Sequence, residues 1–432
     1  MIVAFEQDGY SSISDDTSKL DSKTLFLKTV QNSRYFDKLE EKPAFITPLE
    51  LIKIWQIDRL KIVGVTGTNG KTSVTAAIYS LLLDLDERPA LQGTRGFFAI
   101  EERLEEKVMT TPSILNTLYN MKLALEHNCN YFIMEVSSHA IDQNRIEGLN
   151  FALKVHTNVT SDHLDYHGSV EEYRRVKSLF FADASPKLLN KDDIKNITYN
   201  PINAQSYGVD EPATFKVQAF SLLHGITAGI KHMQTEAVFH SPMVGLFNLF
   251  NLMAAVGSVV MLTGRSLEDV CDVVENFAGV AGRMEVVSRD PLVVVDFAHT
   301  DDGMYQVLDS IKDKDISVVF GAGGNRDRGK RPKMGAVAGR FASKIYVTSD
   351  NPRDEIPEMI LEEILIGLRG KDHVTATPDR RLAIKMALDE MDEDGILLIL
   401  GKGDEDYQEI RGVKYPFDDR EVVRELLDIS SK

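Results

Sequence analysis

Residues 64–75 read GVTGTNGKTSVT, and this stretch decides the fold class of the chain. The apolar run Leu60–Val65 is typical of a buried strand, and a helix is expected to begin near Thr72. Glycines between a strand and a helix let backbone N–H groups close around phosphate oxygens, and the helix N-terminus adds a positive dipole. The Lys71 ammonium can reach terminal phosphates, and the Thr72 hydroxyl can hold Mg²⁺. We therefore predict a nucleotide-binding phosphate loop made of Gly67, Thr68, Asn69, Gly70, Lys71, Thr72 and Ser73.

This loop departs from the strict phosphate-loop pattern, which has glycine at the position of Val65. The alternative is a plain glycine turn between a strand and a helix. The lysine and threonine at the start of the helix favour the phosphate loop.

Short apolar runs alternate with longer amphipathic ones along the chain, a pattern typical of a parallel α/β sheet. The pattern weakens into short strands and polar turns between Asp183 and Phe239, and the strand–helix alternation restarts after Gly282. We predict an α/β fold with three domains: a small N-terminal α/β domain (1–50), a central phosphate-loop parallel-sheet ATPase domain (51–282) and a C-terminal Rossmann-like α/β domain (283–432). Further strands are expected at Asn130–Val136, Phe151–Val159, Pro291–Phe297, Ile316–Gly321, Ser343–Ser349 and Gly395–Leu400, with helices at Glu171–Phe181 and entering from Gly245–Ala255.

Length and charge restrict the class of protein. A chain of 432 residues suits two or three domains, and its formal net charge of -17 argues against a general nucleic-acid binder. A local basic pocket for an anionic substrate remains compatible with that charge. Two distant cysteines, Cys129 and Cys271, favour a reducing compartment over a disulfide scaffold. The N-terminus has no basic start followed by an apolar run, and the longest apolar runs are strand-sized, so a cytoplasmic protein without membrane insertion is expected.

Two polar residues stand where strands are expected to end. Glu135 closes the strand Asn130–Val136, and His163 lies in a polar turn after Phe151–Val159. The carboxyl ends of parallel strands are where α/β sheets bind ligands, and a buried carboxylate there is costly unless it meets a cation. Each residue alone is more often structural, but their convergence beside Thr72 would favour Mg²⁺. From its sequence context alone, Lys177 is predicted to be a solvent-exposed lysine on a helix.

The loop TGTNGKTS resembles the ATP loop of the Mur ligase family and of its relative, folylpolyglutamate synthase. The family builds the peptide of the bacterial cell wall, and the match is strongest to the member that adds the third residue. Other matching motifs run through most of the chain: MEVSSHAIDQNRI (134–146), TNVTSDHLDYHG (157–168), GLFNLFNLMAA (245–255) and, in the last third, AGRMEVV, DFAHT, GAGGNRDRGKRPKMG, SDNPRDE and LGKGDEDYQ.

The resemblance implies an ATP-dependent, ADP-forming ligase of peptidoglycan precursor synthesis, and hence a role in cell shape and division. Its substrates would be ATP, meso-2,6-diaminopimelate and UDP-N-acetylmuramoyl-L-alanyl-D-glutamate, joined at the D-glutamate γ-carboxylate through an acyl phosphate. A monomer is expected, with no covalent protein nucleophile.

The resemblance also implies roles for residues around the nucleotide. Lys71, Glu135, His163 and Lys177 would be catalytic, and Lys177 would react with CO₂ to become a carbamate. Two Mg²⁺ ions would be held by Thr72, Glu135, His163 and the carbamate of Lys177. ATP would also contact Asn251, Arg283, Asp296 and His299. Ala281 and Asp301 stand where the family has proline.

The two other substrates would be held by separate sets of residues. Diaminopimelate differs from lysine by one extra carboxylate, and the planar guanidinium of Arg353 can bind this carboxylate through two parallel hydrogen bonds. Thr17 replaces the usual serine in a short N-terminal domain that would bind UDP, and Asp404 replaces the usual histidine. The UDP-sugar-peptide would contact Thr17, Thr110, Thr111, Ser137, Gln143 and Arg145, and diaminopimelate would contact Arg326, Asp350, Asn351, Pro352, Arg353, Gly401 and Glu405.

Several alternatives stay open from the sequence. The chain could be a lysine-adding ligase, a folylpolyglutamate synthase or a nucleotide-binding regulator that has lost ligation. A Rossmann dehydrogenase is weaker, because GKT replaces the G-x-G-x-x-G turn. Locally, Arg353 could form a surface ion pair with Asp354 or Glu355, and Thr110 and Thr111 could be an ordinary turn before a helix capped by Ser113.

Overall fold

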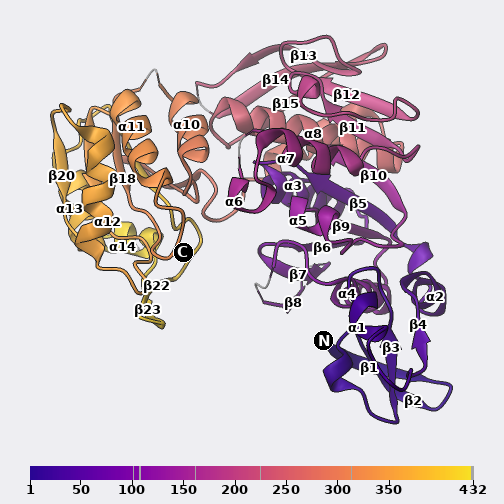
Figure 1. The fold of residues 1–432 in the computed structure, drawn as a ribbon. Coiled ribbons are helices and arrows are strands. Elements are labelled where there is room, and N and C mark those ends of the chain that lie inside the picture. The colour runs from indigo at the N-terminus through magenta and orange to yellow at the C-terminus, as the bar shows by residue number, and fades with distance from the viewer. Residues whose placement is uncertain (101, 107–108, 161, 224, 313, 430–432) are drawn as a thin grey trace. The chain divides into compact units, whose positions relative to one another are not determined.

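The computed structural model describes residues 1–100, 102–106, 109–160, 162–223, 225–312 and 314–429. The chain forms two compact units. The first comprises Met1–Pro242 with Asn248–Phe277, and the second comprises Met243–Phe247 with Ala278–Lys432. Figure 1 shows the elements of each unit in chain order.

The first unit begins with a four-stranded sheet in the order β1-β2-β3-β4. Its helix α2 (Pro48–Ile54) starts with a capping box, in which Thr47 accepts from the Glu50 backbone N–H and the Glu50 side chain accepts from that of Thr47. One apolar core joins this sheet to the central sheet that follows. The remaining elements are β1 (Ile2–Gln7), β2 (Tyr10–Ser14), η1 (Thr17–Lys19), β3 (Thr24–Leu27), α1 (Ser33–Phe36), β4 (Phe45–Ile46) and η2 (Ile57–Arg59).

The central sheet has eleven strands in the order β15-β14-β13-β12-β11-β10-β5-β9-β6-β7-β8. Its strands are β5 (Lys61–Thr66), β6 (Pro89–Gly93), β7 (Gly96–Ala99), β8 (Glu102–Glu105), β9 (Tyr131–Glu135), β10 (Phe151–His156), β11 (Lys187–Asn190), β12 (Ala204–Gly208), β13 (Phe215–Ser221), β14 (Ile226–His232) and β15 (Thr235–Ser241). Strands from β13 to β6 in this order run parallel, as the sequence predicted. Both flanks are antiparallel instead, because β13, β14 and β15 and also β6, β7 and β8 follow one another through short turns.

The helices of this unit are α3 (Lys71–Asp84), α4 (Ile114–Glu126), α5 (Ser138–Asp142), α6 (Leu164–His167), α7 (Val170–Leu179), η3 (Ile194–Asn196), α8 (Leu246–Thr263), α9 (Leu267–Asp272) and η4 (Val274–Asn276). By length and composition alone α8 could cross a membrane, but 72% of its apolar window is buried inside the structure. It therefore has the character of a core helix.

The second unit is a six-stranded sheet in the order β16-β17-β21-β18-β19-β20, parallel except for β16. Alternate strand residues face different cores: Val294 and Leu398 pack with α10, α11 and α12, whereas Val293 and Leu397 pack with α13 and α14. Helices thus cover both faces of the sheet (Figure 1), as in a Rossmann-like domain. The elements are β16 (Glu285–Arg289), β17 (Leu292–Asp296), α10 (Asp301–Asp309), β18 (Ile316–Phe320), α11 (Lys330–Phe341), β19 (Lys344–Val347), α12 (Pro357–Leu365), η5 (Ile366–Leu368), β20 (Val374–Ala376), α13 (Arg380–Glu390), β21 (Ile396–Leu400), β22 (Tyr407–Ile410), β23 (Val413–Pro416) and α14 (Asp419–Leu426).

A buried ion pair ties the strand ends of this second unit together. Arg380 Nε and Nη2 each donate to Asp419 at 2.7 Å, and both side chains are 0% exposed. The guanidinium also donates to the carbonyl oxygens of Ser349 and Leu400. One residue along the helix, Arg381 pairs with Glu425 at 2.6 Å on the open surface.

We expect Arg380→Ala to lower the free energy of unfolding by about 3–5 kcal/mol, because it leaves a buried Asp419 carboxylate and two carbonyls unpaired. The neighbouring variant Arg381→Ala should cost under about 1 kcal/mol, since exposed pairs are screened by water. Urea unfolding followed by circular dichroism measures both, and equal losses would contradict the structural role of the buried pair.

Candidate active site

The loop predicted to bind phosphate lies between β5 and α3, and this strand–loop–helix order is the one that the sequence predicted. Lys71 begins α3, and its Nζ donates to the carbonyl oxygens of Gly67 and Thr68, each at 2.8 Å. Asn158, which follows β10, holds the loop through the backbone N–H groups of Thr68 and Asn69. Gly70 has φ +84°, and a Cβ there would come within 2.4 Å of Asn251 Oδ1. The predicted residue Asn251, on α8, therefore lies directly against the loop.

Glu135 ends β9 at the same edge of the sheet and is 2% exposed. Its carboxylate accepts hydrogen bonds from the Thr72 hydroxyl at 3.1 Å and from the Thr94 backbone N–H at 2.8 Å. The Thr94 hydroxyl also donates to it at 3.2 Å. Among the described residues no cation pairs with this buried carboxylate. A carboxylate and a hydroxyl at such a site suit Mg²⁺, a hard cation that prefers oxygen ligands.

Lys177 lies on α7 and is 1% exposed, so it is not the solvated helix lysine that its sequence suggests in isolation. Its Nζ donates to the Gly67 carbonyl at 2.9 Å and to the Thr66 hydroxyl at 3.3 Å. Lys71 and Lys177 thus share one carbonyl oxygen. Burial, together with the charge of Lys71, lowers the pKa of Lys177 well below its usual range.

His163 lies close to this pair of lysines. Partial burial lowers the pKa of His163 to about 4. The negative charge of Asp162 raises this pKa, whereas the positive charges of Lys71 and Lys177 lower it further. The imidazole is therefore neutral near pH 7 and able to bind a metal ion. No three His, Cys, Asp or Glu side chains form a ready metal cluster in the part of the chain that the structure describes.

Most residues predicted for the sugar-peptide form one hydrogen-bonded group next to Glu135. The Thr111 hydroxyl donates to the Glu135 carbonyl at 2.9 Å and accepts from the Ser137 backbone N–H at 3.0 Å. Arg145 donates to the Thr111 carbonyl and to Gln143 Oε1. Thr110 lies 3.2 Å from Thr94, hydroxyl to hydroxyl.

Thr17 is not part of this hydrogen-bonded group. It begins η1 in the N-terminal sheet region and has no hydrogen bond to another predicted site residue among those described. Ser113 does cap α4, accepting from the Asn116 backbone N–H. The segment before α4 is therefore both a helix start and part of the group around Glu135.

The second unit gathers the other predicted nucleotide residues. Asp296 ends β17 and accepts from the backbone N–H groups of Met284 and Ala298. Burial raises the pKa of Asp296, and the nearby Arg283 opposes that rise. The Arg283 guanidinium stacks 4.1 Å from the Phe297 ring centroid. His299 is exposed, with Nδ1 2.9 Å from the Phe297 carbonyl oxygen.

The residues predicted for diaminopimelate follow β18, β19 and β21, whose carboxyl ends are adjacent in the sheet. Asp350 Oδ2 is buried and has no hydrogen-bond partner among the described residues, and a Cβ at Gly401 would come within 2.5 Å of it. Asn351 Nδ2 donates to Glu405 Oε2 at 2.8 Å, and the buried Lys402 bridges the same two side chains.

Two members of this group differ in their surroundings. Arg326 is exposed in the loop after β18. Arg353, which follows Pro352, does not pair with Asp354 or Glu355 but with Glu409, Nε to Oε2 at 3.1 Å. The surface-pair alternative for Arg353 is therefore wrong.

Sequence reasoning missed three residues that shape these sites: Thr94, Asn158 and Glu409. Thr94 directly follows β6 and Asn158 closely follows β10, so their position at strand ends was a usable signal. Glu409 carried no such signal, because its contact with Arg353 spans 56 positions of the chain.

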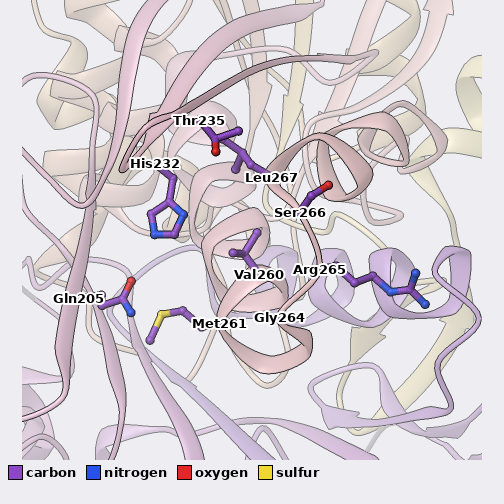
Figure 2. A pocket seen from close by; sticks show the side chains of 9 residues that line it. All are labelled: Gln205, His232, Thr235, Val260, Met261, Gly264, Arg265, Ser266 and Leu267. Carbon is purple, nitrogen blue, oxygen red and sulfur yellow. The ribbon is translucent and has the colours of Figure 1, made fainter.

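A separate pocket of about 330 Å³ lies between β12, β14, β15 and the end of α8 (Figure 2). None of the predicted site residues lines it. Figure 2 shows Gln205 and His232 reaching toward the α8 residues Val260 and Met261. Gln205 Oε1 and His232 Nε2 are buried, and neither has a hydrogen-bond partner in the part of the chain that the structure describes.

Comparisons with known proteins agree with this architecture. Residues 65–259 match the family model "Mur ligase middle domain", and residues 282–403 match "Mur ligase, glutamate ligase domain". A curated relative from Wolinella succinogenes, UDP-N-acetylmuramoyl-L-alanyl-D-glutamate--2,6-diaminopimelate ligase, is 51% identical over 429 residues, covering 99% of this chain and 98% of the relative. The chain therefore belongs to the Mur ligase family, which confirms the family expected from its motifs.

Solved structures show the same fold. A structure of a UDP-N-acetylmuramoyl-L-alanyl-D-glutamate--2,6-diaminopimelate ligase has a TM-score of 0.68 at 31% identity and covers 96% of this chain and 94% of its own. A bifunctional folylpolyglutamate synthase/dihydrofolate synthase from Yersinia pestis, with AMPPNP and Mn, has a TM-score of 0.62 at 19% identity, covering 85% and 94%. The predicted α/β fold class is confirmed.

Proposed function

We propose that this chain joins meso-2,6-diaminopimelate to the D-glutamate γ-carboxylate of UDP-N-acetylmuramoyl-L-alanyl-D-glutamate, converting ATP to ADP and phosphate. ATP-dependent ligation follows from the family, and the near full-length relative named for this reaction supports the substrates. The observation that carries the proposal within this chain is the meeting of Lys71, Lys177 and the Gly67 carbonyl beside the buried Glu135.

The chemistry is an acyl-phosphate mechanism. The γ-carboxylate attacks the γ-phosphorus of ATP, which releases ADP and forms the acyl phosphate. The amine of diaminopimelate then attacks the acyl carbon, and the tetrahedral intermediate expels phosphate and loses a proton to give the amide. Lys71 offsets negative charge on the transferred group, and the network of Thr111, Ser137 and Arg145 orients the carboxylate.

The divalent cations would be held by Thr72, Glu135, His163 and the carbamate of Lys177. When bound by these residues, Mg²⁺ would supply positive charge to offset that of the phosphoryl and carboxylate oxygens. A carbamate forms from the neutral amine, and burial together with the charge of Lys71 lowers the pKa of Lys177, which favours that neutral form.

The proposal also covers the site of the UDP group, the domain boundaries, the cellular location and the oligomeric state. The short N-terminal sheet region around Thr17 would hold the UDP end of the acceptor, with domain boundaries at residues 50 and 282. The ligase would act in the cytoplasm as a monomer, without membrane insertion.

Choice of the third residue would depend on Arg353. We expect Arg353→Ala to reduce kcat/KM for diaminopimelate by about 10²–10⁴-fold, because the distal carboxylate loses its bidentate cation. Use of lysine, which lacks that carboxylate, should change little. Coupled ADP release with the UDP-muramoyl dipeptide and each amino acid measures both ratios.

The exposed Arg369 offers a matched control, and Arg369→Ala should behave as wild type. Equal losses with diaminopimelate and lysine would contradict the specificity role of Arg353. Wild-type turnover with lysine but not diaminopimelate would instead point to a lysine-adding ligase.

A further inference from the structure

The hairpin β22–β23 clamps the loop that carries Arg353. The Arg353 backbone N–H donates to the Glu409 carbonyl at 2.9 Å, and the Arg411 N–H donates to the Arg353 carbonyl at 2.8 Å. The Glu409 N–H donates to Asn351 Oδ1 at 2.9 Å. Arg353 itself has φ +51°, a backbone conformation that a non-glycine residue adopts only when its surroundings enforce it. The hairpin therefore fixes the backbone from which the arginine extends.

The guanidinium of Arg353 is held at two of its donors. Nε donates to Glu409 Oε2 at 3.1 Å, and Nη1 donates to the Gly324 carbonyl at 2.8 Å. A Cβ at Gly323 would come within 3.0 Å of Nη1, so a side chain there would crowd the group. These contacts leave the long arginine side chain few alternative rotamers.

The same contacts decide which edge of the guanidinium stays available. A carboxylate can accept two parallel bonds either from Nε and one Nη, or from Nη1 and Nη2. Glu409 occupies the Nε position, and among the described residues Nη2 has no acceptor. Nη1 donates one of its two hydrogens to the Gly324 carbonyl, so its other hydrogen and those of Nη2 remain for a substrate carboxylate. The side chain is 22% exposed.

We propose that Glu409 is a specificity-determining positioning residue that acts through Arg353 and does not touch the substrate. Its carboxylate holds Nε so that the outer edge of Arg353 faces the distal carboxylate of diaminopimelate. The inference rests on the proposed function, since it names how that site selects its amino acid. Pre-orientation of the arginine lowers the rotamer entropy lost when the substrate binds.

The test compares Glu409→Ala and Glu409→Gln with wild type. In Glu409→Ala the KM for diaminopimelate should rise at least about tenfold while kcat changes less than about twofold, because only an orienting contact is lost. Glu409→Gln should lie between, since its amide oxygen can still accept from Nε. The KM for ATP, the use of lysine and the unfolding midpoint should stay unchanged, because the backbone bonds of the hairpin remain.

The control Glu425→Ala removes an exposed glutamate that also pairs with an arginine, and it should match wild type. The double variant Glu409→Ala/Arg353→Ala should lose no more than Arg353→Ala alone, because Glu409 acts only through that arginine. Additive losses, or an unchanged or lower KM for diaminopimelate in Glu409→Ala, would overturn the inference alone. A wild-type protein that does not release ADP with diaminopimelate would overturn the proposed function and this inference with it.

Discussion

Replacing Lys71 with alanine should reduce ADP release by about 10³–10⁵-fold, the range seen when a cation is removed from a phosphoryl-transfer site. Lys71 is the first residue of α3, and its Nζ lies over the carbonyls of Gly67 and Thr68. From there it can reach the terminal phosphates and offset their growing charge. Coupled ADP release at saturating ATP and dipeptide measures the effect.

A matched control is Lys231→Ala, which removes an exposed lysine on β14 that pairs with Glu236. It should keep wild-type turnover. The unfolding midpoint of Lys71→Ala should stay near that of wild type, because the bonds that Lys71 donates to the carbonyls of Gly67 and Thr68 lie within its own loop. Normal turnover in Lys71→Ala would remove the phosphate-loop assignment and with it the proposed function.

The strand–loop–helix structure around the proposed phosphate loop was predictable because all its determinants are local. A strand, glycines and a lysine that begins a helix stand within twelve residues, and the structure has β5 and α3 in those places. Glu135 was predictable for a related reason, since it closes an apolar strand whose end lies at the sheet edge where β5 also ends. The antiparallel flanks of the sheet were not, because short strands between polar turns do not reveal their direction.

The burial of Lys177 could not be predicted from the local sequence. Its helix reads VEEYRRVKSL, and a lysine among so many charged residues favours a solvated face. The structure buries it because α7 packs that face against the end of β5, at Thr66 and Gly67. Burial of this kind comes from tertiary packing between segments 110 positions apart, which no pattern within the helix encodes.

One of the two residues that replace a proline of the family, Asp301, has a local explanation. Asp301 stands at the first position of α10, after the capping residue Thr300. A carboxylate there interacts favourably with the positive end of the helix dipole, so the helix start is preserved without proline. Nothing in the structure explains Ala281.

Replacing Lys177 with alanine should reduce turnover by about 10³-fold, because the loss of one ligand to a charge-neutralising cation removes several kcal/mol of transition-state stabilisation. Added formate or acetate should restore part of the activity, since a small carboxylate can occupy the space left by the carbamate. ADP release with and without each anion measures this rescue. The control Arg175→Ala, an exposed arginine on the same helix paired with Glu172, should keep wild-type activity and show no rescue.

The proposed carbamate of Lys177 would depend on pH with a definite sign. The neutral amine of Lys177 and CO₂ form the carbamate and release one proton, so carbamate occupancy should fall as pH falls and the amine is protonated. The pKa of Lys177, lowered first by burial and then by Lys71, places that loss below the range of an ordinary lysine. Carbon-13 NMR of protein equilibrated with labelled bicarbonate should show one carbamate signal that Lys177→Ala lacks. Full activity of Lys177→Ala without added carboxylate, or an identical signal in that variant, would show that Lys177 does not supply the carbamate.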